Sequence, residues 1–150
     1  MNLRDLPLGA LIVRDGLARP DAVRVALIDA QESDRRLGEV MLERGLIREH
    51  DLARLLAQQE KLEFVDLAKL DLDAAALDSL PESVARAHGA VAYGLAGKTL
   101  LVAVADPTDD AALDAVRAAL RGRRVRFHVA LASEIVVALA EGYGEPVAAA

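Results

Sequence analysis

The chain has 150 residues, a formal net charge of −6 and no cysteine. The missing cysteine excludes disulfides, zinc–thiolate sites and thiol nucleophiles, and the negative charge argues against broad electrostatic binding to DNA, RNA or anionic lipid. No apolar run reaches the roughly 18 residues that a membrane-spanning helix needs, and the N-terminus lacks the apolar core of a signal peptide. These features lead us to expect a cytoplasmic protein.

An internal repeat organises the first sixty residues. Residues 7–30 match residues 36–59 after a shift of 29 positions, and each copy reads as an apolar helix, a glycine and a second apolar helix. Such a glycine favours a left-handed helix end, and Pro20 suits the first turn of a helix. The repeat therefore predicts four helices in two tandem pairs. The matched positions are Leu8 with Leu37, Gly9 with Gly38, Ile12 with Met41, Gly16 with Gly45, Leu17 with Leu46, Arg19 with Arg48, Val23 with Leu52, and Leu27 with Leu56.

After Glu60 the apolar pattern changes from helical spacing to short alternating segments. Asp106 and Ser133 are placed to cap the last two helices, because short polar side chains accept hydrogen bonds from free amides of a first turn. The pattern predicts strands at 62–67, 90–93, 99–104 and 125–131, with helices between 71 and 88, from 106 to about 120, and from 133 to about 143.

The predicted fold class is α+β. A helical subdomain of two tandem helix-pair repeats occupies residues 1–60, and a smaller C-terminal subdomain at 61–144 combines an antiparallel sheet with packed helices. Residues 145–150 are expected to begin a linker.

No catalytic residue, metal ligand or cofactor is predicted. Residues 92–99 come close to a nucleotide-binding P-loop, but Ala92 replaces the first glycine, and the closing Lys98 and Thr99 run into an apolar strand. A P-loop must instead enter a helix whose amides hold phosphate, so we predict a hairpin turn and no ATP hydrolysis. The histidines are isolated from one another, and we expect His128 on the outward face of its strand.

The turn that opens the second repeat can be interpreted in two ways. Gly38 would let a ligand approach a helix start, Arg36 could pair with a phosphate or stack on a base, and Gln59 could offer its amide to a base edge. Alternatively, Leu37 is core, Gly38 eases helix packing, and Arg36 is a solvated surface charge. Spacing alone favours the packing interpretation, because these three residue types are common at helix ends.

Here the sequence resembles the N-terminal domain of type II secretion and type IV pilus assembly ATPases, the MshE N-terminal class. Members that bind cyclic di-GMP have two tandem copies of R-L-G-x-x-L-x-x-x-x-x-L-x-x-x-x-L-x-x-x-L-x-x-Q, separated by five residues. Residues 36–59 fit this motif, and residues 31–35 form the spacer. The similarity extends over about the whole chain, including residues 64–67 and 104–109.

The resemblance implies a site in which each copy binds half of the symmetric dinucleotide. It assigns polar contacts to Arg36 and Gln59, the approach to the ligand to Leu37 and Gly38, and a further contact to Asp106. The apolar surface beneath the ligand would come from Leu52 and Leu56 of the second copy and from Leu8, Gly9, Val23 and Leu27 of the first.

The first copy departs from the motif at its two polar positions. Pro7 stands where the arginine is expected and Ala30 where the glutamine is expected. Loss of a charged hydrogen-bond partner costs on the order of 1.5–3 kcal/mol, and loss of a neutral one about 1 kcal/mol. We therefore expect cyclic di-GMP binding that is weakened, altered or lost.

Two functional hypotheses follow. In the first, the chain is a non-catalytic regulatory domain that binds cyclic di-GMP and acts on a downstream ATPase or another effector. In the second, it is a protein–protein docking domain that links the ATPase to secretion or pilus assembly proteins of the inner membrane, without nucleotide. Both imply a cytoplasmic domain, or one held at the inner membrane through its partner, and neither involves DNA or RNA.

Overall fold

The computed structural model describes residues 5–144, so the linker predicted at 145–150 lies outside the described residues. These residues form two compact units, which divide between Lys61 and Leu62. Each unit has its own apolar core. Among the described residues, no helix is both long and apolar enough to cross a bilayer.

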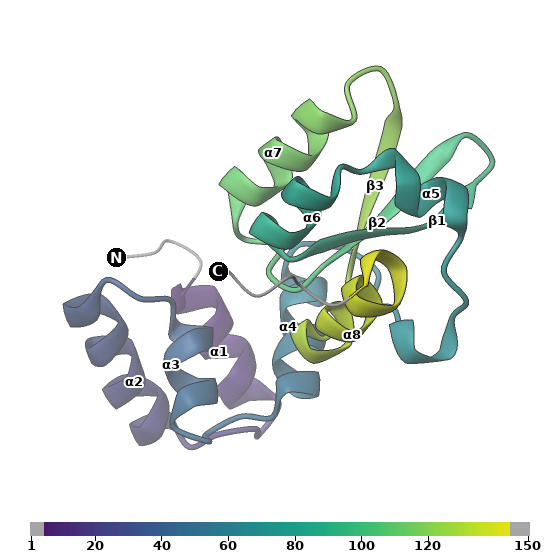
Figure 1. The fold of residues 1–150 in the computed structure, drawn as a ribbon. Helices are drawn as coiled ribbons and strands as arrows, with labels where there is room; N and C mark the ends of the chain where they lie inside the picture. The colour runs from purple at the N-terminus through teal and green to yellow at the C-terminus, as the bar shows by residue number, and fades with distance from the viewer. Residues whose placement is uncertain (1–4, 145–150) are drawn as a thin grey trace. The chain divides into compact units, whose positions relative to one another are not determined.

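The first unit contains the four helices that the repeat predicts (Figure 1). The two copies share their turn geometry. Gly16 and Gly45 have φ values of 68° and 69°, and the next residue of each copy, Leu17 or Leu46, donates to the carbonyl of Ile12 or Met41. Equivalent backbone bonds in both copies show that the sequence repeat is also a structural repeat. The helices are α1 (Asp5–Arg14), α2 (Pro20–Ser33), α3 (Leu37–Glu43) and α4 (Glu49–Gln59).

The second unit is a small three-stranded sheet with helices packed on it (Figure 1). The fold class is α+β as predicted, but the sheet is mixed: β1 pairs with β2 antiparallel, and β2 pairs with β3 parallel. The reason is that α7 forms a crossover between β2 and β3, the connection that parallel neighbours require. The elements are η1 (Leu67–Lys69), α5 (Ala74–Ser79), α6 (Glu82–His88), β1 (Ala90–Ala96), β2 (Thr99–Val104), α7 (Asp110–Ala119), β3 (Arg124–Val129) and α8 (Ala132–Tyr143).

Three predicted element boundaries in this unit are wrong. The strand predicted at 62–67 is reduced to one parallel bridge between Phe64 and Val129. The helix expected from Asp106 begins at Asp110, because Asp109 accepts the cap hydrogen bond from the Ala112 amide. The last helix has Leu131 at its N-cap, without a side-chain cap bond, so Ser133 lies inside the first turn.

The turn between β1 and β2 confirms the rejection of the P-loop. Gly97 has a φ of 62°, and Thr99 begins β2 directly, paired with Ala96. Lys98 and Thr99 therefore do not open a helix, and no set of helical amides follows them.

Candidate functional site

Arg36 is the N-cap residue of α3. Its backbone is extended, with φ −82° and ψ 146°, and its side chain is half-buried. The next two residues turn inward: Leu37 is fully buried, and a Cβ added to Gly38 would lie 3.2 Å from both end methyls of Leu52. Gly38 therefore lets the start of α3 lie close against α4. This packing of Gly38 against Leu52 is part of the geometry of the site.

One face of α4 continues from this contact. Leu52, Leu56 and Gln59 are spaced four and three residues apart, so they lie on the same side of the helix. Gln59 is two turns beyond Leu52, about 10 Å along the axis, and its carboxamide oxygen is buried. Leu52 is buried and Leu56 half-buried. Gly38, at the start of α3, thus packs against one end of an α4 face whose other end holds Gln59.

A carboxylate already occupies the first amide of α3. Asp5, in the first turn of α1, is 6% exposed and accepts a hydrogen bond of 3.2 Å from the Leu37 backbone amide. Burial raises the pKa of Asp5, while the Leu37 hydrogen bond and the nearby Arg36 charge oppose the shift. The Leu37 amide is therefore already paired within the protein and is not available to an anion.

The first copy does not reproduce this arrangement. Pro7 lies inside α1, whereas its counterpart Arg36 precedes α3 in extended backbone. Ala30 is 1% exposed, whereas its counterpart Gln59 is half-buried. The first copy therefore differs in backbone and burial as well as in residue type.

The apolar positions expected from the motif in the first copy are mostly core. Leu8 and Val23 are each 4% exposed, Leu27 is half-buried, and a Cβ added to Gly9 would lie 3.2 Å from Val23. Gly9 and Gly38 thus have the same packing role in the two copies. Leu8, Val23 and Leu27 belong to the apolar core that underlies the helical surface of the first unit.

Asp106 belongs to the second unit. Its carboxylate accepts hydrogen bonds from the backbone amide of Thr108, at 2.9 Å, and from the Thr108 hydroxyl. This closes the turn before α7, so the residue has a structural role of its own.

The buried polar pair of Tyr93 and His128 in the second unit was not predicted from the sequence. His128 is 5% exposed and not on an outward face, because the last half of β3 is covered on both sides. The Tyr93 hydroxyl is hydrogen-bonded to His128 Nδ1, and Nε2 lies 3.4 Å from Glu63. Burial lowers the pKa of His128 and raises that of Tyr93 to about 12. The apolar residues beside His128 in β3 could have indicated in advance that this histidine is buried.

The described residues form no candidate metal site. No group of three or more histidine, cysteine, aspartate or glutamate side chains is placed to hold an ion there.

Comparison with known proteins gives consistent matches. The model of the MshEN domain matches residues 60–149. The solved structure of MshE with cdg has 32% sequence identity and a TM-score of 0.82, and the match covers 91% of this chain and 98% of that one. The type IV pilus assembly ATPase PilB of Myxococcus xanthus is 30% identical over 138 residues, 92% of this chain and 24% of its own length. Bacteriophage adsorption protein B of Escherichia coli is 28% identical over 137 residues, 91% of this chain and 18% of its own length. The chain therefore spans a quarter or less of these two relatives.

Proposed function

The chain belongs to the MshEN domain family, and from that premise we propose that it is a non-catalytic regulatory domain that binds cyclic di-GMP through residues 36–59. The observation that supports this most is the second repeat, which has Arg36, Leu37, Gly38 and Gln59 of the motif, with Met41 and Ile47 at two leucine positions, on a well-formed α3–α4 pair. The similar MshE structure contains cdg, which we take to be this dinucleotide.

In the proposed complex, the Arg36 guanidinium pairs with a phosphate or lies flat on a guanine. Arg36 precedes α3 in extended backbone, and its half-buried position limits competition from water. The Gln59 carboxamide meets a base edge at the other end of the α4 face. Leu52 and Leu56 support that surface from below.

The proposed affinity is weaker than that of a domain with two complete copies. Pro7 provides no charge, and Ala30 is too deeply buried to be replaced by a carboxamide without disturbing the core. Two missing partners correspond to a loss of roughly a hundredfold or more, at about 1.4 kcal/mol per factor of ten.

Isothermal titration of the purified chain with cyclic di-GMP tests the proposal. We expect saturable heat, and an affinity that falls about ten- to a hundredfold in Arg36→Ala, the loss expected for one charged hydrogen bond. Arg121→Ala is the matched control, because this arginine is exposed in the other unit and removes the same charge. Absence of heat at high micromolar ligand, or equal losses in both variants, would contradict the proposal.

A docking domain without nucleotide is the second candidate function. The first copy supports it, since both its backbone at Pro7 and its burial at Ala30 depart from a ligand site. In that case the partners are assembly proteins at the inner membrane, and the chain is cytoplasmic or peripheral through them. A wild-type chain that gives no heat with cyclic di-GMP, yet binds an assembly protein of its own cell, would favour this function.

The whole protein's activity is a further proposal. The pilus relative suggests a downstream ATPase, whereas the phage adsorption relative suggests that the same module serves other effectors.

A further inference from the structure

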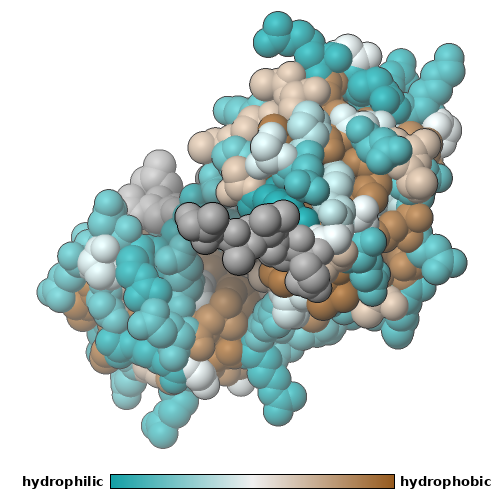
Figure 2. Space-filling model, viewed as in Figure 1, coloured by the Kyte–Doolittle hydropathy of each residue, from teal (hydrophilic) through white to brown (hydrophobic). Residues whose placement is uncertain are grey.

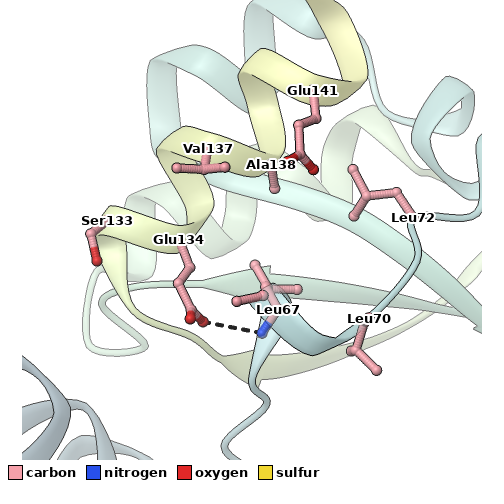
Figure 3. Close-up of a pocket in the computed structure, with 9 residues that line it drawn as sticks. Leu67, Leu70, Leu72, Ser133, Glu134, Val137, Ala138 and Glu141 are labelled. Carbon is pink, nitrogen blue, oxygen red and sulfur yellow. Dashed lines mark hydrogen bonds between the residues drawn. The ribbon is translucent and has the colours of Figure 1, made fainter.

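A groove of about 290 Å³ lies within the second unit, between α8 and the segment around η1. Figure 3 shows Val137 and Ala138 on α8 across from Leu67 and Leu72 of the other wall, while the side chain of Leu70, also at the groove, points away from α8. The groove shares no residue with the α3–α4 site. An occupant of this groove would therefore be bound independently of the dinucleotide.

Large apolar side chains remain exposed along this groove. Val137 is 55% exposed and Leu70 is 43% exposed, and Val136, beside the groove, is 66% exposed. The inner face of α8 is buried at Ile135 and Leu139, so the core does not need the two valines. Figure 2 shows hydrophobic surface over α8 on the viewed face. Exposed apolar surface gathered at a groove is typical of an interaction site.

The groove is held in shape by a carboxylate. Glu134 accepts a hydrogen bond of 3.1 Å from the Leu67 amide and so ties α8 to η1 (Figure 3). Apolar contact with an occupant can form here without first ordering the two walls, which lowers the entropic cost of binding.

The charge at the groove is acidic. Glu134 and Glu141 lie seven residues apart on α8, two turns or about 10 Å, and none of the nine lining residues is basic. Asp66 stands next to Glu134, and Lys69 lies 3.5 Å from Asp66. Negative groups at both ends of an apolar floor repel phosphates and anionic lipid and attract cationic side chains.

We propose that this groove docks a basic amphipathic helix of a partner protein. One or two apolar side chains, three or four residues apart on that helix, fill the space between Val137 and Leu72. Lysine or arginine residues about two turns apart face Glu134 and Glu141. Such a segment matches both the apolar floor of the groove and its acidic ends.

Photo-crosslinking in the protein's own cells tests the proposal on the full-length protein. A benzophenone amino acid replaces Val137, and the same residue at Val25 serves as control, because this valine of α2 is 53% exposed. We expect Val137→benzophenone to give an adduct whose partner peptide has apolar residues at helical spacing and flanking lysine or arginine. The Val25 position should not yield that adduct.

Charge reversal supplies the second arm of the test. Glu141→Lys should lower the yield of the adduct about threefold or more, since an exposed ion pair contributes up to about 1 kcal/mol. Asp114→Lys, on the exposed side of α7, should leave the yield unchanged. If Glu141→Lys melts at a lower temperature than the parent chain, Glu141→Gln replaces it, with the same direction expected.

Several results would overturn the proposal. In the crosslinking arm, these are no adduct at Val137, an adduct to a second copy of the chain or to lipid, or a partner peptide without basic residues. In the charge-reversal arm, the contradicting result is an adduct yield that stays the same when the charge at position 141 is changed. None of them bears on cyclic di-GMP binding, which is measured separately by titration.

Discussion

Asp5 is the residue that most directly limits the proposed site. Its carboxylate caps α3 from a different helix, 32 positions earlier in the chain, and lies within the electrostatic reach of Arg36. An internal anion beside the one motif arginine competes with a ligand phosphate for that arginine. Asn at this position keeps an oxygen that can accept the Leu37 amide but removes the charge.

We predict that Asp5→Asn binds cyclic di-GMP several-fold more tightly, because about 1 kcal/mol of competing charge interaction is removed. Isothermal titration measures the change, with Asp21→Asn as control, since that side chain is 82% exposed and lies 3.9 Å from Arg24. Unchanged or weaker binding in Asp5→Asn would show that this carboxylate does not oppose the ligand.

The second contact between individual residues with a measurable consequence is the buried hydrogen bond between Tyr93 and His128. Burial raises the pKa of Tyr93 to about 12, from an ordinary 10.0, with Glu63 adding to the rise. Burial also lowers the pKa of His128 from 6.5, against the opposing effect of Glu63. The folded state therefore favours the neutral forms of both side chains.

The pair predicts a plateau of stability with two limbs. Below pH 6.5 the unfolded chain binds the His128 proton more readily, so stability falls as the pH falls. Above pH 10 the unfolded chain loses the Tyr93 proton more readily, so stability falls as the pH rises towards 12, by up to about 2 kcal/mol. Urea unfolding at a series of pH values measures both limbs. Tyr93→Phe should lose its share of the alkaline limb and keep the acid one; an alkaline limb of unchanged size would contradict this assignment.

At the scale of elements, the two helix pairs of the first unit behave as copies. Arg19 and Arg48 are both extended N-cap residues, and their carbonyls accept from Val23 and Leu52 at 3.1 and 3.0 Å. The copies differ at their starts, where α1 already includes Pro7 but α3 begins after Arg36, and at their ends, where α2 runs to Ser33, three residues past the position that matches the end of α4. The divergence is therefore concentrated where the ligand contact is proposed.

Because the two turns have the same geometry, replacing the glycine of either turn should destabilise the protein equally. Gly16 and Gly45 have positive φ, and a Cβ added at either would meet nothing within 4 Å. Gly16→Ala and Gly45→Ala should each destabilise the first unit by about 1–2 kcal/mol, from backbone strain alone. Urea unfolding of the two variants checks this. A clear difference between them would mean that the turns are not equivalent in energy.

Helical spacing and glycine stops predicted the first unit well, because both signals are local in sequence. The direction of β3 was also open to prediction: a ten-residue helix between two strands is the usual connection of parallel neighbours. The start of α7 was harder, since Asp106 and Asp109 both bind amides and only the geometry assigns the cap to Asp109. The Asp5–Leu37 bond was beyond reach, because it joins residues whose proximity depends on tertiary packing.

At the scale of the whole molecule, the chain is two units with separate cores. The MshEN model matches residues 60–149, mainly the second unit, whereas the proposed ligand residues lie in the first. Family membership therefore rests mostly on the second unit, whereas the proposed cyclic di-GMP binding depends on the first.

The most direct measurement is an NMR titration of the isotope-labelled chain with cyclic di-GMP. We predict saturable shifts of the Arg36, Leu37 and Gly38 amides and of the Gln59 side-chain amide, with small changes around Pro7 and Ala30. Shifts confined to residues 7–30, or none at millimolar ligand, would contradict the claim that the second repeat is a working half-site.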